Sequence, residues 1–304
     1  MLMFRGQFSD YFLGTQLPFL RIVIQQRYSQ YAHMYDKIFD IQTSTRSMEQ
    51  TSEISGLGLL QPINEGDPVE FDSMVQGFKQ SFTHTKRGIG YQFTRDMIDD
   101  DQFSIVSRAN AELGRSVFET IEITAASVLN NAFVTAGPDG VALCSANHPL
   151  PKAGGVQSNV GAVADLNVTS LQVALTAFET QRNITGQIVH MPCKNLIVAP
   201  ANRWIAYETV KSSDRPDTAN RATNPLQYAE DGLPTPRIWR YLTDPAAWFL
   251  SGPPAETGLV WFWRRKPYVK GWVDDSTETA KTAIRYRESH GFYTYQGVWG
   301  SPSH

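Results

Sequence analysis

The sequence has little cysteine and no long hydrophobic run. Cys144 and Cys193 are the only cysteines among 304 residues, and they do not form a CxxC pair. Two isolated thiols make no disulfide framework, so we expect both to be reduced. No apolar run approaches the roughly 18 residues of a membrane span. Polar Gln7 and Ser9 stand where a signal peptide has its apolar centre. The sequence therefore predicts a soluble, cytoplasmic protein without membrane contacts.

The motifs of nucleotide and metal sites are also missing. No GxGxxG or GxxxxGK[ST] loop is present, and the six histidines show neither HxxxH nor HExxH spacing. The acidic run at residues 99–101 could attract a cation, but three consecutive carboxylates cannot all face one ion. We interpret this run as the cap of a helix. The sequence predicts no cofactor, no metal site and no catalytic residue.

One pair of residues leaves an enzymatic alternative open. Cys144 lies four positions before His148, and a thiol with an imidazole can form a nucleophilic pair. The sequence adds no nucleophile elbow and no partner that would orient the histidine. A cysteine hydrolase that uses Cys144 and His148 is therefore the alternative from a different functional class.

Positive charge is sparse. The net charge is −3 and the estimated pI is 6.1, so the chain has no global basic field for nucleic acid. Small basic groups occur at residues 86–87 and 264–266. Each group is either a solvated strand end or, in an assembly, a contact to acidic neighbours or to packaged nucleic acid.

The clearest periodic pattern predicts one long helix over residues 101–134. Apolar or small residues recur there at steps of three and four, which indicates a single buried stripe. The stripe consists of Val106, Ala109, Leu113, Val117, Ile121, Ala125, Val128 and Ala132. The opposite face is predicted to be exposed, and it carries Arg108, Glu112, Arg115, Glu119 and Glu122. Such a helix would be about 50 Å long.

Residues 51–93 precede this helix and predict a long β-hairpin. Glycines punctuate the stretch, and apolar residues alternate with polar ones around Phe71, Phe78, Phe82 and Tyr91. A hairpin this long is marginal in water by itself and needs a surface to lie on. Its own domain and a second subunit are the two possible partners.

The remaining segments predict a mixed fold. Residues 21–41 are partly helical, helices are expected at 166–181 and 202–211, and 212–236 is expected to be a long exposed loop. Strands are expected at 195–200, 238–250, 259–263, 268–273 and 282–295, the last two joined by a turn at 274–276. Strand, turn and helix in this order predict an α/β or α+β lobe from about residue 163.

The order of these segments resembles the major capsid (head) protein of tailed bacteriophages, the Hong Kong ninety-seven type fold, and within it the Mu-like major head subunit group. Six strings carry the resemblance, in order along nearly the whole chain from about residue 45. They are residues 88–101 before the helix, 126–134 at its end, 139–149, 196–200, 241–250 and 286–302.

The resemblance implies an α+β phage major capsid fold with an N-terminal arm, an extended β-hairpin loop, a long spine helix, a peripheral domain and an axial domain. The expected boundaries are 1–50 for the arm and 51–93 for the extension loop. The spine helix and the first part of the peripheral domain are expected at 94–162, the axial domain at 163–258 and the peripheral return strands at 259–304.

The function implied by the resemblance is self-assembly into an icosahedral head shell around double-stranded DNA, bound without sequence specificity. The implied partners are other copies in hexamers and pentamers, a portal, a decoration protein and a scaffolding protein. A separate scaffold is expected because only about 50 residues precede the hairpin. Assembly would take place in the host bacterial cytoplasm.

The arm and hairpin residues expected at contacts between subunits are Arg21, Tyr28, Phe71, Phe78, Phe82, Lys86 and Arg87. Deletion of residues 55–90 is expected to leave a soluble subunit that forms no stable particles. An encapsulin-like compartment with enzyme cargo is the alternative on the same fold.

Overall fold

A computed structural model describes residues 12–54, 56–66, 68–69, 71–74, 76–100, 103–212, 224, 226, 233–274 and 276–303. The helices are η1 (Phe12–Gln16), α2 (Leu17–Gln30), η2 (Tyr35–Lys37), α3 (Arg95–Asp99), α4 (Phe103–Asn130), α5 (Val168–Glu179), η3 (Pro200–Asn202) and α6 (Arg203–Lys211). The strands are β1 (Asp40–Thr43), β2 (Met48–Ile54), β3 (Gln76–Thr83), β4 (Thr85–Thr94), β5 (His148–Pro149), β6 (Val156–Gln157), β7 (Asn195–Val198), β8 (Thr235–Ile238), β9 (Trp248–Ser251), β10 (Leu259–Asp274), β11 (Thr279–Phe292) and β12 (Val298–Ser301).

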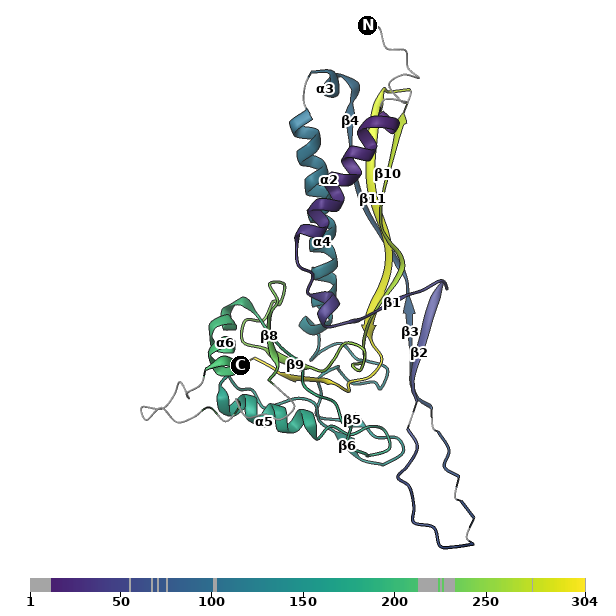
Figure 1. The fold of residues 1–304 in the computed structure, drawn as a ribbon, viewed down its shortest axis with the longest axis vertical. Coiled ribbons are helices and arrows are strands. Elements are labelled where there is room, and N and C mark those ends of the chain that lie inside the picture. Colours follow the sequence, from purple (N-terminus) through teal and green to yellow (C-terminus); the bar gives the residue numbers. More distant parts are fainter. Residues whose placement is uncertain are drawn as a thin grey trace.

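The molecule consists of a long upright part, a lobe at one end and a projecting hairpin (Figure 1). The upright part is a sheet in the order β1-β10-β11-β4, with α2 and α4 along one face. The lobe contains a second sheet in the order β12-β9-β7-β8, together with α5 and α6. The hairpin of β2 and β3 leaves the body beside the lower end of the long sheet. The mixed α+β fold class is confirmed.

Helix α4 confirms the long helix. Its buried side includes Leu113, Val117, Ile121 and Ala125, four residues of the predicted stripe. Helix α2 crosses the same side at Gly114, where an added Cβ atom would lie 2.7 Å from the backbone oxygen of Ile24. The absence of a side chain at Gly114 therefore lets the two helices touch.

Glu122 corrects the prediction of a uniformly exposed charged face on this helix. Only 1% of Glu122 is exposed. Its carboxylate accepts hydrogen bonds from the backbone N–H of Met34 at 2.8 Å and from Nε1–H of Trp239 at 2.9 Å. A buried carboxylate needs such donors because it has lost its water. Glu122 thereby ties the segment after α2 and the lobe to the long helix.

The expected cap at residues 99–101 lies partly outside the described residues, so the structure does not test whether the run caps α4. Asp99 ends the short helix α3 and Asp100 is its C-cap, while Asp101 and the side chain of Asp99 lie outside the described residues. The N-cap of α3 is Thr94, whose side chain accepts a bond from the backbone N–H of Met97.

Strand β10 is longer than predicted because it runs through Pro267. The register shifts on both sides of Arg265, between Trp263 and Tyr268, and β1 pairs only with residues 260–263 of β10. A proline is tolerated at such a bulge, where the other edge of the strand carries no ladder of hydrogen bonds. Residues 259–274 therefore form one strand, where the sequence had predicted two.

Strand pairing also corrects two predicted groupings. Strand β4 pairs with β11 over its whole length, so residues 85–94 belong to the long sheet and not to a hairpin arm. Strand β12 pairs with β9, so the end of the chain contributes to the sheet of the lobe. The hairpin itself consists of β2 and β3, and Val69 and Phe71 lie outside any strand.

The lobe has its own core, in which Trp248 and Trp299 pack with 5.0 Å between ring centroids. Helix α5 begins with a capping box between Asn167 and Ser170. Of the predicted loop 212–236, residues 213–223, 225 and 227–232 lie outside the described residues. Within the described ranges, no helix is both long and apolar enough to cross a membrane.

Candidate assembly surface

The base of the hairpin is fixed to the body of its own chain. His84 lies between β3 and β4, and its two ring nitrogens are each 2.9 Å from a serine hydroxyl, those of Ser44 and Ser289. Phe82 is 4% exposed and packs against Phe262 with 5.4 Å between centroids. His84 and Phe82 therefore anchor the hairpin at the point where it leaves the long sheet.

The tip of the hairpin, residues 56–74, is exposed at every position that the structure describes. Seven large apolar side chains there are more than half exposed, with Leu60 at 99% and Phe71 at 96%. The seven are Leu57, Leu59, Leu60, Ile63, Val69, Phe71 and Met74. Apolar surface gathered in this way is typical of an interaction site, because a monomer gains nothing by exposing it.

Lys152 of the lobe makes polar contacts with Asp72 and Ser73 of the tip. Nζ of Lys152 lies 3.2 Å from both carboxylate oxygens of Asp72, and Oδ2 of Asp72 also accepts from the backbone N–H of Gly58 at 2.7 Å. These bonds hold the pKa of the exposed Asp72 carboxyl below its usual range, with the Gly58 bond as the largest cause. Asp72 thus joins the two limbs of the tip and ties them to Lys152 of the lobe.

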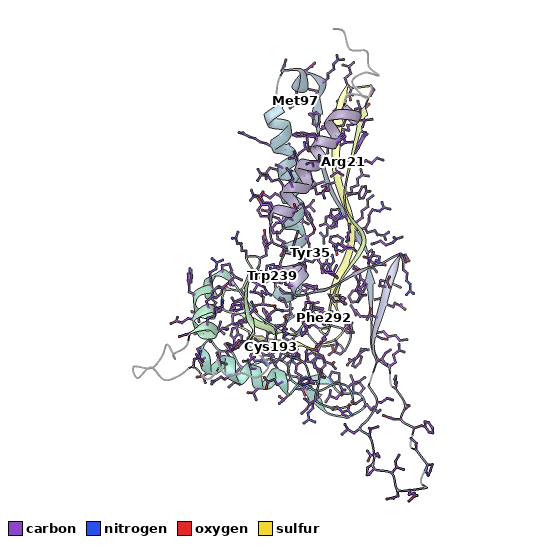
Figure 2. All side chains as sticks on the ribbon, viewed as in Figure 1. Arg21, Tyr35, Met97, Cys193, Trp239 and Phe292 are labelled. Atoms are coloured by element: carbon purple, nitrogen blue, oxygen red, sulfur yellow. The ribbon has the colours of Figure 1, made fainter. Side chains whose placement is uncertain are left out.

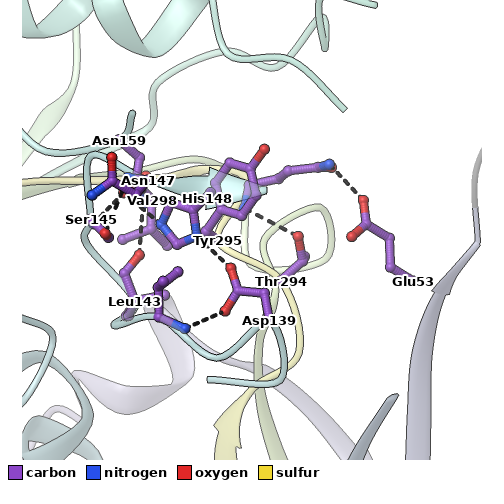
Figure 3. A network of polar contacts seen from close by, with 12 residues as sticks. Glu53, Asp139, Leu143, Ser145, Asn147, His148, Asn159, Thr294, Tyr295 and Val298 are labelled. Atoms are coloured by element: carbon purple, nitrogen blue, oxygen red, sulfur yellow. Dashed lines mark hydrogen bonds and ion pairs between the residues drawn. The ribbon is translucent and has the colours of Figure 1, made fainter. Parts of the chain in front are cut away.

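Below the hairpin base lies a network of buried polar groups (Figure 3). The amide nitrogen of Asn159 donates to the backbone oxygens of Leu143 at 2.7 Å and Val298 at 3.1 Å. Its Oδ1 therefore faces Nε2 of His148 at 3.0 Å, while Nδ1 of His148 lies 2.5 Å from Oδ2 of Asp139. The His148 ring also stacks on Tyr295 with 3.9 Å between centroids. The network joins the loop after α4 to the last strand of the chain.

Strand β2 is attached to this region by Glu53. Nε2 of Gln296 donates to Oε1 of Glu53 at 2.6 Å. Burial is the largest influence on this carboxyl and raises its pKa to about 7, and the nearby charge of Asp139 acts in the same direction. The attachment of the hairpin base therefore contains a group that titrates near neutral pH.

The structure contradicts a Cys144–His148 nucleophilic pair. Both nitrogens of His148 are occupied, by Asp139 and by Asn159, so the ring has no free acceptor for a thiol proton. Burial raises the pKa of the Cys144 thiol far above its ordinary value. A nucleophilic cysteine needs the opposite shift, because the thiolate is the reactive form.

The seven residues predicted at subunit contacts fall into two groups. Phe71, Lys86 and Arg21 are exposed, and Figure 2 shows Arg21 on α2 in the upper part of the molecule. The other four are engaged within the chain: Phe82 packs on Phe262, Tyr28 contacts His33, Arg87 pairs with Glu288 at 3.1 Å, and Phe78 lines a small cavity beside Glu53. Phe82 is covered because β3 turns this side of the strand toward β10.

The residues expected at subunit contacts did not include Leu57, Leu59, Leu60 and Ile63 of the tip, although all four are more than half exposed. The signal was present, because residues 57–63 contain four large apolar residues between glycines and prolines with neither a helical nor a strand period. Apolar residues without a period indicate surface that no regular element buries. Among the described residues, no group of His, Cys, Asp and Glu is placed to hold a metal ion.

Comparisons with known proteins support a structural role. A family model for phage capsid proteins matches residues 78–299, more than two thirds of the chain. No curated protein sequence matches this chain. Several solved structures are similar in fold. The capsid of Cyanophage P-SCSP1u has a TM-score of 0.56 at 9% identity and covers 90% of this chain and 88% of its own.

Two further structures have the same fold at low identity. The virus-like particle from Pyrococcus furiosus has a TM-score of 0.54 at 9% identity, over 94% of this chain and 98% of that one. The capsid of Cyanophage Pam1 has a TM-score of 0.54 at 11% identity, over 90% and 91%. The shared fold and the family match identify a shell subunit that is a structural protein and not an enzyme. The chain belongs to the phage capsid protein family.

Proposed function

We propose that this capsid subunit interlocks with its neighbours in the shell through the tip of its hairpin. One observation carries the proposal: residues 56–74 expose seven large apolar side chains on a segment that leaves the body of the subunit. Full burial of a single such side chain in an interface is favourable by about 1.5–3 kcal/mol in free energy. In a shell, a neighbouring copy of the subunit is always present and can provide the surface that covers these side chains.

The N-terminal region supplies a second candidate contact. Helix α2 packs on α4 of its own chain, yet Phe19 and Ile22 beside Arg21 are 53% and 54% exposed. Residues 1–11 lie outside the described residues. We infer that the outer side of α2 is also covered by a neighbouring subunit in the shell. This exposed helix face supports the expectation that the N-terminal arm contacts other subunits.

The finer parts of the proposal concern the assembled head. Copies would form hexamers and pentamers of an icosahedral lattice, since repeated heterologous contacts close when the rotation closes. The lattice would assemble with a separate scaffolding protein in the bacterial cytoplasm, add a portal and a decoration protein, and enclose double-stranded DNA. The net charge of −3 fits a shell that is filled by a motor and does not itself condense DNA.

The proposed subdivision keeps the arm, extension loop, peripheral domain and axial domain in the expected order, with β4 assigned to the long sheet and β12 to the lobe. The Mu-like group is the proposed subgroup. Because a virus-like particle from Pyrococcus furiosus shares the fold, a cargo compartment is the competing use of such a shell. Nuclease-resistant, genome-length DNA in purified particles supports the phage head, and a co-purifying enzyme supports the compartment.

The decisive experiment removes the tip and spares β4. Ile54 and Gln76 are paired across β2 and β3, so residues 55–75 can be replaced by a two-residue Asn-Gly turn. Deletion of 55–90, as suggested by the sequence, would also remove six residues of β4 from the long sheet. We expect the shortened subunit to be soluble and folded but to form no shells in electron micrographs; normal shells would refute the role of the hairpin.

A point-variant pair gives a matched control. Leu60→Ser with Phe71→Ser removes two side chains that are exposed in the free subunit, and Val173→Ser removes an exposed residue of α5, 65% exposed. Neither change should alter the melting temperature of the free subunit. Only the hairpin pair should lower the yield of shells.

A further inference from the structure

A groove lies where the upright part of the molecule meets the lobe. It consists of two adjoining depressions of about 350 and 420 Å³, and Met34 and Ile238 line both of them. Figure 1 shows β8 and α6 of the lobe beside the lower end of α4, and Figure 2 places Trp239 and Tyr35 at this level. We call this surface the junction groove. Because its lining comes from both parts of the molecule, an occupant would contact the upright part and the lobe at once.

Aromatic side chains dominate the lining of the junction groove. Tyr31 stacks on Phe118 with 4.9 Å between ring centroids, and Trp204 of α6 is 75% exposed in the second depression. The aromatic residues of the lining are Tyr31, Phe118, Trp204, Tyr207, Trp239 and Tyr241. Tryptophan, tyrosine and arginine are the side chains enriched at the energetic centres of protein interfaces. An exposed tryptophan in a concave surface is therefore typical of a contact with another protein.

The groove also carries positive charge that the described residues do not balance. Its lining contains four arginines and two glutamates. Both glutamates are satisfied within the chain, Glu119 by Arg115 at 2.8 Å and Glu122 by the donors described above. Arg203 and Arg240 form no ion pair with any described residue. Two unpaired cations beside apolar walls favour an occupant that carries both carboxylates and an apolar side chain.

We propose that the junction groove binds an acidic segment of the scaffolding protein. An aromatic or aliphatic side chain of that segment would lie between the aromatic walls, and its carboxylates would pair with Arg203 and Arg240. A ligand that contacts two parts of a molecule favours the arrangement to which it binds more tightly. The scaffolding protein would thereby hold the upright part and the lobe at one angle while copies assemble. This inference rests on the proposed function, which includes such a partner.

Nucleic acid is the competing occupant of the groove. Bases stack on aromatic side chains, and grooves for single strands combine such stacking with a row of cations that follows the phosphates. Here Arg115 is bonded to Glu119, and Arg237 donates to Oδ1 of Asn195 at 3.0 Å. Among the described lining residues, two separate arginines remain for an anion. They suit a few carboxylates of a short peptide better than a continuous phosphate chain.

Binding of a labelled peptide to the free subunit tests the chemistry of the groove. The probe is a short synthetic peptide with a central Leu-Phe pair flanked by glutamates, and fluorescence anisotropy measures its affinity. Arg203→Glu with Arg240→Glu should weaken binding about tenfold, which corresponds to about 1.4 kcal/mol. Trp204→Ser should weaken it by a similar factor, because the apolar wall is lost. A second peptide with lysines in place of the glutamates should prefer the double arginine variant to the unchanged subunit.

A charge-matched variant is the control for these measurements. Lys266→Glu with Lys270→Glu makes the same change of net charge at exposed residues of β10 and should leave the affinity unchanged. Circular dichroism establishes that every variant is folded. Equal weakening by the control and by the arginine variant would overturn the proposal, because the peptide would then respond to net charge alone. Absence of binding to the unchanged subunit, or tighter binding of a single-stranded thymidine oligonucleotide, would also overturn it.

Cross-linking in immature particles identifies the occupant. Tyr207 lines the groove and is 37% exposed, so replacement of this residue by photoreactive benzoylphenylalanine places the reactive group at the site. Mass spectrometry should map the cross-link to an acidic segment of a protein other than the capsid subunit. A cross-link to a second copy of the subunit or to nucleic acid would overturn the proposal. Such a result together with loss of shells on tip deletion would leave the proposed function intact, whereas normal shells without the tip would refute that function whatever the groove binds.

Discussion

At the scale of single residues, the buried polar side chains of this subunit bond across segments that are far apart in the sequence. Glu122 accepts from Met34 and Trp239, and Asn159 donates to Leu143 and Val298. Each group is isolated from water, so its partners are required for the fold. These residues fix where the N-terminal segment, the long helix and the end of the chain meet.

Replacement of Glu122 by alanine should be strongly destabilising. The change leaves the N–H groups of Met34 and Trp239 buried without an acceptor, which costs about 3 kcal/mol in the free energy of unfolding. Urea unfolding of the free subunit measures this. Glu112→Ala is the control, since Glu112 lies on the exposed side of α4 with only a 3.8 Å ion pair to Arg115, and it should change stability by less than about 0.5 kcal/mol. Equal losses for the two variants would contradict the role given to Glu122.

The sequence could not reveal Glu122 as buried. The pattern of charges at 108, 112, 115, 119 and 122 suits an exposed face, and Arg115 and Glu119 do pair there at 2.8 Å. The last position differs because the segment after α2 and residue Trp239 fold over it. That covering comes from residues about 90 positions before and 120 positions after Glu122, as the bond separations of 88 and 117 show, and local periodicity contains no information on it.

At the scale of elements, the hairpin has a fixed base and a projecting tip. The base is held by His84 between two serines and by Glu53 on Gln296. The pKa of Glu53 in the folded protein, about 7, is above its ordinary value of 4.5. The folded state therefore binds a proton more tightly than the unfolded state, and this contribution to stability is lost as pH rises from about 4.5 through about 7.

Hydrogen exchange should show this loss in one place. Between pH 6 and pH 8, after correction for the intrinsic rate, amides of β2 and β3 should lose protection, while those of β10 and β11 should not. In Glu53→Gln the local pH dependence should disappear, because the amide carries no titrating proton and keeps a polar group near Gln296. A pH dependence that persists in Glu53→Gln would assign it to another group.

The crossing of α2 and α4 depends on the missing side chain of Gly114. Gly114→Ala would place a Cβ atom 2.7 Å from the backbone oxygen of Ile24, so α2 must move. We expect a loss of about 1–3 kcal/mol, even though alanine favours a helix over glycine by about 1 kcal/mol. Gly56→Ala has nothing within 4 Å of the new atom and is the control in the same thermal unfolding measurement. A stabilised Gly114→Ala subunit would show that the crossing is looser than described.

Elements were predictable where a pattern is local. The helix at α4, the helix at α6 and the short strand β7 follow from periodicity, from turns and from a terminating Pro200. Pairing was not predictable in the same way. The stretch at β4 alternates as a hairpin arm would, and only the register with β11, nearly 200 residues later, assigns it to the long sheet.

At the scale of the whole molecule, the order of elements was more informative than any motif. An arm, a hairpin, a long helix, a mixed lobe and long return strands together indicated a phage capsid subunit, and the family match over residues 78–299 confirms it. The assembly surface was only partly predictable. Phe71 is exposed as expected, but Phe82 and Tyr28 pack within their own chain, because alternation along a strand does not say which face is covered.

In the proposed assembly, the exposed tip of the hairpin is covered by another copy of the subunit. Electron cryomicroscopy of assembled shells tests it most directly, with the path of residues 56–74 traced from its own subunit. We expect the tip to lie on a neighbouring subunit, with Leu60 and Phe71 buried there. A tip folded back on its own subunit, or a native protein that stays monomeric, would contradict it.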